Sequence, residues 1–265
     1  MTARRRIFVV ALLLVFLAGA ACADNLTVAA AADLNFALRD LAADFQARTE
    51  HRVSVVYGSS GNFFAQIQNG APFDVFLSAD LSYPRQLEQL GLIEPGSLKV
   101  YAIGKLVLWG PKTSQSDLQA LGMKALLAPG VQQIAIANPR HAPYGRAAVA
   151  ALQHAGLYDR VKPELVYAEN IAQAAHFIES GNADLGLIAL SIALSPEMQS
   201  KGAYWTVPEG WYPPLEQGAV ILKRTRHLAA ARAFVDYLKS PAAAAILKRY
   251  GFSLPATGPA PKEAP

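Results

Sequence analysis

The chain has 265 residues, of which 52% are apolar and 17% are charged, so it can bury a substantial core and is not a disordered, collagen-like or coiled-coil protein. Three of its 24 Lys and Arg residues are Arg4 to Arg6, and the 21 others nearly balance 20 Asp and Glu residues. The rest of the chain is close to neutral and its cations are scattered, so the sequence indicates no basic patch that could bind the phosphates of a nucleic acid. No nucleic-acid partner is therefore expected.

Residues 1–23 are predicted to be a secretory signal peptide. Arg4 to Arg6 form a positively charged start, an apolar run follows from Ile7, and Ala21 to Ala23 match the small-residue pattern of a cleavage site. The apolar run is shorter than the about 20 residues that a transmembrane helix needs. We therefore expect export to the periplasm and a mature chain that begins near Asp24.

The only cysteine, Cys22, lies at the end of this segment and would be removed with it. The mature chain would then contain no thiol, no disulfide and no thiolate metal site. Alternatively, Cys22 becomes a lipid-modified N-terminus that anchors the protein to a membrane. Residues 19–21 lack the large aliphatic side chain that such signals carry, so the soluble form is preferred.

From Asp24 onward, short β-rich runs alternate with segments of helical periodicity. In the first predicted helix, Leu34, Leu38, Leu41 and Phe45 fall on one face. The predicted elements up to residue 91 are the strands 26–30, 53–57 and 75–78 and the helices 33–48, 61–69 and 83–90.

A second series with the same alternation begins after Tyr101. Its predicted elements are the strands 105–109, 134–137, 164–167, 185–189 and 217–222 and the helices 144–155, 171–180, 228–239 and 241–250. The tail, 255–265, is rich in Pro and Ala and is expected to be unstructured. Alternation of strand and helix predicts an α/β fold with mainly parallel sheets covered by helices.

In such sheets a ligand binds beyond the carboxyl ends of the strands, where the next helix presents unpaired N–H groups and a partial positive charge. The informative positions are therefore the strand-to-helix junctions, at residues 31–33, 58–62, 78–80, 138–145 and 169–171. Four of the five junctions carry small residues, which leave the backbone N–H groups open to a ligand.

Of these junctions, the turn Gly58-Ser59-Ser60-Gly61 carries the groups best suited to binding a ligand. Two hydroxyl groups and an open backbone at a helix N-terminus form a neutral donor site for an anion. Alternatively, one of the serines only caps the helix, which is the usual role of serine there. The turn fails the G-x-S-x-G pattern of a serine nucleophile at Asn62. No carboxylate partner can be assigned by spacing to the three histidines His141, His154 and His176.

The chain from about residue 26 to 254 resembles the exported molybdate-binding proteins that supply ATP-driven transporters. The most specific stretch is 66–80, QIQNGAPFDVFLSAD. Shorter matching stretches are 58–61 (GSSG), 101–109 (YAIGKLVLW), 136–139 (IANP), 142–145 (APYG) and 183–186 (ADLG).

The resemblance implies a two-lobed periplasmic binding protein fold, type II-like, with an oxyanion held in the cleft between two αβ lobes. Two crossing strands, near 101–105 and near 216–219, would join the lobes. The first lobe would contain residues 24–104 and 217–254, and the second residues 105–216.

The family binds its anion through hydroxyl and backbone N–H groups, without a countercharge. Carried over by position, Ser60 would supply a hydroxyl group, and Ala79, Tyr144 and Ile171 would supply backbone N–H groups. Molybdenum would be present only as the oxyanion, and no cofactor is expected. At the first junction the family has Ser, or a Thr-Asn pair, where this chain has Ala32 and Asp33.

Asp33 is the main departure, because a carboxylate that faces a dianion repels it. One hypothesis is that Asp33 binds through its backbone N–H while its side chain caps the helix, which suits molybdate or tungstate. The other is that its carboxylate accepts a proton from the ligand, which suits hydrogen phosphate.

We therefore predict an exported, non-enzymatic solute-binding protein that captures molybdate, and tungstate, for the permease of an ABC transporter in the inner membrane. A monomer is expected. A binding protein for another tetrahedral oxyanion, such as phosphate or sulfate, is the alternative, and an exported serine hydrolase is a distant one.

Overall fold

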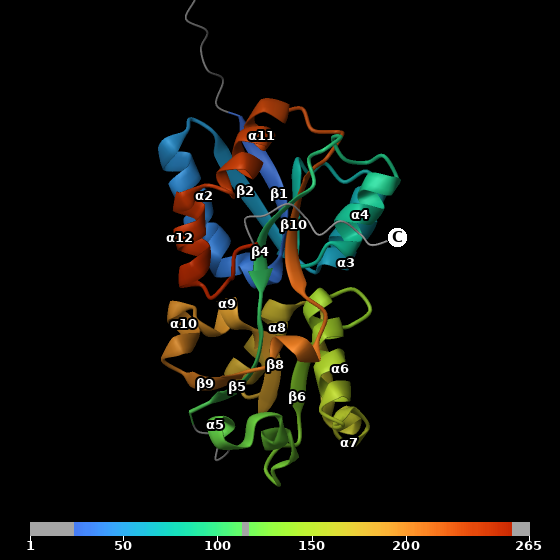
Figure 1. Cartoon of the computed structure of the whole chain (residues 1–265), viewed down its shortest axis with the longest axis vertical. Helices are drawn as coiled ribbons and strands as arrows, with labels where there is room; N and C mark the ends of the chain where they lie inside the picture. The colour runs from blue at the N-terminus through green and yellow to red at the C-terminus, as the bar shows by residue number, and fades with distance from the viewer. Residues whose placement is uncertain (1–23, 113–116, 256–265) are drawn as a thin grey trace, which may run out of the picture.

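The computed structural model describes residues 24–112 and 117–255. The predicted signal peptide with Cys22, and the predicted tail apart from Pro255, lie outside the described residues. Figure 1 shows two αβ lobes stacked along the long axis of the molecule, with β4 and β10 running toward the junction between them. No helix of the described part is long and apolar enough to cross a membrane.

The first lobe contains a five-stranded sheet in the order β2-β1-β3-β10-β4. The strand β1 is parallel to its neighbours β2 and β3, and β10 is antiparallel to β3 and β4. Its strands are β1 (Asn25–Ala31), β2 (Arg52–Gly58), β3 (Val75–Ser78), β4 (Lys99–Gly104) and β10 (Leu215–Ile221).

Helices cover both faces of this sheet, so the first lobe has two apolar cores. In β1 the alternation of side chains sends Leu26, Val28 and Ala30 into one core and Ala29 into the other. The first core lies under α2 (Asn35–Arg48), α11 (Leu228–Tyr237) and α12 (Pro241–Arg249), and the second under α3 (Ser60–Gln68) and α4 (Ser82–Gln89).

The second lobe has a five-stranded sheet in the order β7-β6-β8-β5-β9, with β6 parallel to β7 and β8 and with β5 antiparallel to β8 and β9. Its strands are β5 (Leu106–Pro111), β6 (Ile134–Ala137), β7 (Leu165–Ala168), β8 (Leu185–Ala189) and β9 (Gly202–Thr206). Its helices are α5 (Leu118–Leu121), α6 (Pro143–His154), α7 (Tyr158–Val161), α8 (Ile171–Glu179), α9 (Leu190–Ala193) and α10 (Pro196–Gln199).

Short 3-10 turns complete the fold: η2 (Ala32–Leu34), η3 (Gly122–Leu127), η4 (Lys162–Glu164) and η5 (Glu209–Trp211). The predicted first helix therefore begins as the turn η2 and continues as α2. The edge strand β9 is not among the predicted elements, because its five residues pair on one side only, with β5, and show no clear apolar alternation.

Two chain segments connect the lobes. The first is β4 to β5, interrupted only at Lys105, as predicted. The second is residues 207–214, between β9 and β10. The two predicted crossings, 101–105 and 216–219, lie opposite each other where the first sheet meets this junction, because Ile103 pairs with Glu216 and Ala102 with Gln217. The apolar run of β10 marks the buried part of the strand and not its start.

Candidate functional site

The residues at the carboxyl ends of β1, β2 and β3 meet two junctions of the second lobe around one cavity between the lobes. The cavity holds about 200 Å³ of atom-free space. This figure includes open solvent at the edge of the cavity, so the enclosed space is smaller still and suits a small ion. All six residues that the sequence singles out line it: Ala32, Asp33, Ser60, Ala79, Tyr144 and Ile171. Their roles in binding stay predictions.

Four helices begin at this cavity: α2, through the turn η2, and α3 from the first lobe, and α6 and α8 from the second. Each N-terminus presents N–H groups without intrahelical partners and a partial positive charge. In α8 the Asn170 side chain accepts hydrogen bonds from the N–H groups of Ala172 and Gln173, at 3.1 and 3.0 Å. The first N–H of the helix, that of Ile171, therefore stays available at the cavity.

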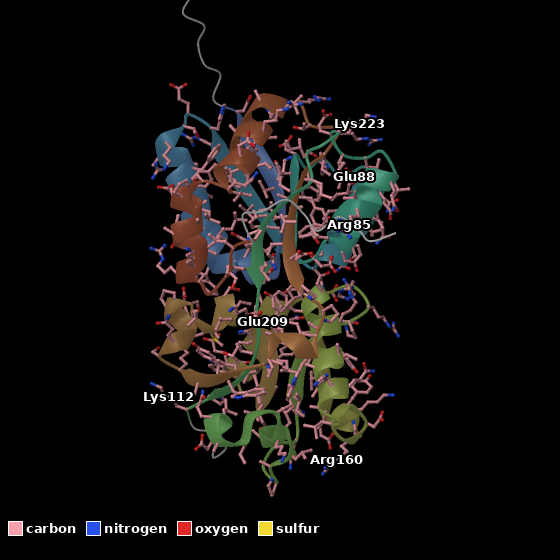
Figure 2. All side chains as sticks on the ribbon, in the orientation of Figure 1. Arg85, Glu88, Lys112, Arg160, Glu209 and Lys223 are labelled. Carbon is pink, nitrogen blue, oxygen red and sulfur yellow. The ribbon has the colours of Figure 1, made fainter. Side chains whose placement is uncertain are left out.

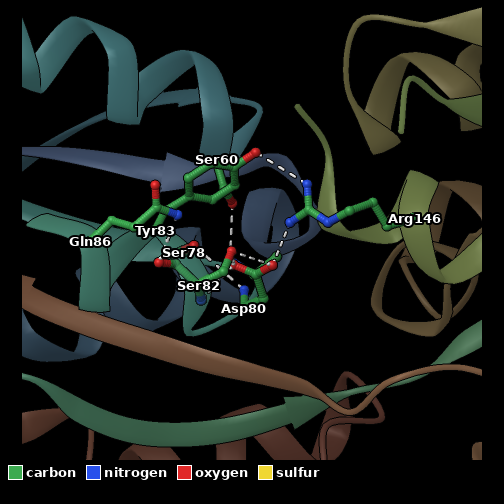
Figure 3. Close-up of polar contacts among 8 residues, drawn as sticks. Ser60, Ser78, Asp80, Ser82, Tyr83, Gln86 and Arg146 are labelled. Atoms are coloured by element: carbon green, nitrogen blue, oxygen red, sulfur yellow. Dashed lines mark hydrogen bonds and ion pairs between the residues drawn. The ribbon is translucent and has the colours of Figure 1, made fainter. Parts of the chain in front are cut away.

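Ser60 and Ala79 are hydrogen-bonded to each other at the cavity wall. The Ala79 N–H donates to Ser60 Oγ at 3.1 Å, and Ser60 is fully buried (Figure 3). Among the described residues neither Ser59 nor Ser60 makes a side-chain cap on α3, so the capping interpretation is wrong. Because its oxygen accepts the Ala79 N–H, the Ser60 hydroxyl keeps its own proton free to donate to a ligand.

Asp33 does not cap a helix either. Its side chain is 1% exposed, and neither carboxylate oxygen has a hydrogen-bond partner among the described residues. Burial raises the pKa of Asp33 to about 7, although the nearby Tyr144 hydroxyl and Gln217 amide act in the opposite direction. The capping hypothesis for Asp33 is therefore wrong, because the turn η2 directs the carboxyl group into the protein interior.

The other charged side chains lie away from the cavity, and of the described residues no Lys, Arg or His lines it. Charged residues such as Arg85, Glu88 and Arg160 are exposed on the outside of the two lobes (Figure 2). No group of three or more His, Cys, Asp or Glu side chains in the described part of the chain could hold a metal ion. The cavity thus offers neutral donors and helix dipoles to an anion, with Asp33 as the exception.

The two lobes are in contact across the cleft, so the structure is in a closed conformation. The backbone N–H of Gly61 donates to the carbonyl of His141 at 2.8 Å, and the Ser191 hydroxyl donates to the carbonyl of Asp33 at 2.6 Å. The apolar core of the second lobe continues onto Ala32 and Ala79 of the first. The lobes therefore touch next to the cavity through residues of both, and sequence reasoning did not identify Gly61 and Ser191 as contact residues.

A histidine also takes part in this closure. His141 Nδ1 lies 2.9 Å from Ser59 Oγ in the other lobe, and its Nε2 lies 3.8 Å from Glu169 Oε2. Two of the three histidines thus do face a carboxylate, because His176 lies 3.8 Å from Glu179, whereas His154 stacks on Trp211. The sequence could not reveal the first pair, since its members come from different elements. This arrangement does not involve Ser60, the nucleophile that the hydrolase hypothesis requires.

An ion pair joins the two lobes next to the cavity. Arg146 of α6 contacts the Asp80 carboxylate at 2.5 Å and donates to the Tyr83 hydroxyl at 3.1 Å (Figure 3). Asp80 follows β3, in the most family-specific stretch of the sequence. The pair joins two lobes that must separate to admit a ligand, so its contribution is to the closed state.

We expect Arg146→Gln to weaken ligand binding modestly, because the pair is partly exposed and such pairs contribute about 0.2–1 kcal/mol. The affinity should fall up to about fivefold, and less at high ionic strength. Arg140→Gln, on an exposed arginine of the same lobe that makes no ion pair among the described residues, is the matched control. Equal losses in both variants, measured by titration at low and high salt, would contradict a specific role for Arg146.

Comparison with known proteins agrees with this geometry. The family model of the bacterial extracellular solute-binding proteins matches residues 26–253. The chain is 44% identical over 246 residues to the molybdate-binding protein ModA of Azotobacter vinelandii, with 93% of this chain and 96% of the relative covered. It is 40% identical over 232 residues to ModA of Rhodobacter capsulatus, with 88% and 89% covered.

A solved structure shows the same architecture. The periplasmic molybdate-binding protein of Azotobacter vinelandii matches with a TM-score of 0.82 at 42% identity, over 87% of this chain and 99% of that one. Together with the two helix-covered sheets, this match confirms the predicted two-lobed α/β fold class.

Proposed function

Since the chain belongs to the family of bacterial extracellular solute-binding proteins, we propose that it captures molybdate, and tungstate, between its lobes and delivers the anion to an ABC importer. The observation that carries this proposal is a small cavity between the lobes where four helices begin and which, in the described part of the chain, no cationic side chain lines. Such a site favours a compact anion over a larger or cationic solute.

The donors to the anion would come from both lobes, so that binding stabilises the closed conformation. Ser60 would donate its hydroxyl proton, and the backbone N–H groups of Asp33, Tyr144 and Ile171 would point at the oxygens of the ligand. The N–H of Ala79 would act indirectly, because it already holds Ser60 Oγ in place. Charge-assisted hydrogen bonds of this kind are about twice as strong as neutral ones.

The Asp33 carboxyl group in the cavity wall supports one alternative, a site for a tetrahedral oxyanion that carries a proton, such as hydrogen phosphate. Sulfate has no such proton, and only its similar shape supports it. The serine hydrolase hypothesis has less support, because Ser60 contacts the Ala79 N–H and the relatives named above are binding proteins.

Calorimetric titration of the purified mature protein with molybdate, tungstate, sulfate and phosphate tests the proposal. We expect saturable binding of one molybdate or tungstate per chain and no heat from the other two anions. Binding of phosphate or sulfate alone would instead support the alternative, and absence of binding by all four would contradict an oxyanion site.

The proposal includes a place and a partner. The protein would act in the periplasm as a monomer and pass its ligand to the permease of the importer. We expect mass spectrometry of the secreted form to find an N-terminus at or near Asp24, because Ala21 to Ala23 match a cleavage site. An acylated Cys22 would show instead that the protein is anchored to a membrane.

A further inference from the structure

Asp33 belongs to a group of buried polar side chains below the floor of the cavity. The members come from four elements: Asp33 from η2, Tyr101 from β4, Tyr144 from α6 and Gln217 from β10. Both carboxylate oxygens of Asp33, both tyrosine hydroxyls and Gln217 Oε1 have no hydrogen-bond partner among the described residues. The strands β4 and β10 pair with each other next to the connections between the lobes, so this group lies at the hinge.

The packing around Gly104, the last residue of β4, shows how closely these side chains approach. A Cβ atom placed on Gly104 would meet both the Tyr144 hydroxyl and, at 3.0 Å, Gln217 Nε2. Tyr144 comes from the second lobe, whereas Asp33, Tyr101 and Gln217 come from the first. Closure therefore brings Tyr144 of the second lobe to a group that the first lobe supplies.

An ionised Asp33 does not suit this environment. Its oxygens and Gln217 Oε1 can only accept hydrogen bonds, and the neutral Tyr144 hydroxyl and Gln217 amide N–H are the donors close to Asp33. A buried carboxylate without a partner is strongly disfavoured, and such a group usually becomes neutral. A proton on Asp33 would turn one acceptor into a donor, and it would also remove the repulsion between Asp33 and a bound anion.

We propose that closure of the cleft around the oxyanion takes up one proton, and that Asp33 holds this proton. The inference rests on the proposed function, because it concerns the same site. It gives the Asp33 carboxyl group a role, as the holder of this proton, that the family resemblance does not account for. It also makes the affinity for the anion depend on pH.

The groups that face Asp33 support this assignment. Tyr101 and Tyr144 have pKa values well above their usual range, mainly through burial and then through the Asp33 charge, so both stay neutral. Lys105, between β4 and β5, pairs with Glu209, and Arg39 of α2 pairs with Glu197. On the side of α9, Ser191 contacts only the Asp33 carbonyl. No cation in the described part of the chain contributes to the Asp33 pKa.

The direction of the pH effect follows from the pKa values. In an open cleft Asp33 is in water and ionises near the ordinary value of 3.8, whereas in the closed cleft its pKa is about 7. A bound dianion raises the closed value further. The closed state thus holds more protons, so the affinity should rise as the pH falls from about 7 toward about 4 and should be flat above the closed-state pKa.

The test is calorimetric titration of the mature protein with micromolar molybdate in two buffers of different ionisation enthalpy. We expect an uptake of nearly one proton per anion at pH 6 and, by linkage, an affinity at least about 20-fold higher at pH 5.5 than at pH 7.5. In Asp33→Asn, molybdate should still bind, but proton uptake and pH dependence should be lost. Asp74→Asn is the control, because Asp74 is also buried but lies at the opposite end of β3 with the Thr27 N–H and Thr225 as partners.

The outcomes separate the inference from the proposed function. Molybdate binding without proton uptake by the unmodified protein would overturn the inference and leave the proposed function intact. Histidine is the other side-chain type that changes charge between pH 5 and 8. Uptake that persists in Asp33→Asn and disappears in His141→Gln would therefore also overturn it. Absence of molybdate binding at every pH would overturn both. If Asp33→Asn does not fold, the proton count of the unmodified protein still tests whether closure takes up a proton, and persistence of that uptake in His141→Gln tests the assignment to Asp33.

Discussion

Replacing Ser60 with alanine is expected to lower the affinity for molybdate by roughly 10- to 150-fold. The variant removes one hydrogen bond to a charged ligand, worth about 1.5–3 kcal/mol. It also leaves the buried Ala79 N–H without its acceptor, so stability should fall by about 1 kcal/mol. Titration calorimetry measures the first effect and thermal unfolding without ligand measures the second.

Ser78→Ala is the matched control for this experiment. Ser78 is also fully buried and lies next to Ala79, but among the described residues its hydroxyl has one hydrogen-bond partner, the Asp80 N–H at 3.4 Å (Figure 3), and Ser78 does not line the cavity. The affinity of Ser78→Ala for molybdate should be close to that of the unmodified protein. An unchanged affinity in Ser60→Ala, with lower stability alone, would show that Ser60 supports the fold and does not bind the ligand.

Gly61→Ala is expected to weaken binding by preventing closure and not by removing a donor. A Cβ atom at this position would lie 2.6 Å from the Tyr83 hydroxyl and 2.7 Å from the His141 carbonyl oxygen of the other lobe. Overpacking of this kind costs about 1–3 kcal/mol, which corresponds to roughly 5- to 150-fold in affinity. In the open state the contact with the His141 backbone is absent and only the end of the flexible Tyr83 side chain, from the same lobe, must shift, so the stability of the unliganded protein should change little.

Gly130→Ala is the control that distinguishes hindered closure from a general effect of replacing glycine with alanine. A Cβ atom on Gly130 meets nothing within 4 Å, and its backbone does not require glycine. This variant should bind molybdate like the unmodified protein. X-ray scattering of Gly61→Ala with saturating molybdate should show a more extended molecule than the unmodified complex. An equally compact complex with unchanged affinity would contradict a role for the close approach at Gly61.

Sequence periodicity was sufficient to predict most of the fold. The strands and long helices of both lobes follow from apolar alternation and from helix-ending glycines, because these elements are decided by local pattern and burial. Periodicity was insufficient for β4, which only the family resemblance implied, for β9 and for the start of β10. All three depend on pairing partners far away in the chain, such as Gly104 opposite Leu215, which a local pattern does not reveal.

The candidate site was predictable as positions but not as contacts. Small residues at strand ends and the family resemblance point to the six residues that the structure brings around one cavity. They do not show that Ser60 bonds to Ala79, that His141 reaches Ser59, or that Asp33 turns away from the helix end. The His141 contact arises only when the two lobes meet, and the Ser60–Ala79 bond joins two separate junctions of the first lobe, so the sequence contains no local signal for either.

The central claim, that the cavity between the lobes is a molybdate site made of neutral donors from both lobes, is tested most directly by anomalous X-ray diffraction. Crystals of the mature protein grown with molybdate should give one strong molybdenum peak in this cavity. We expect its oxygens within hydrogen-bond distance of the Ser60 hydroxyl and the Ile171 N–H. A molybdenum peak elsewhere on the protein, with the cavity empty, would contradict the account.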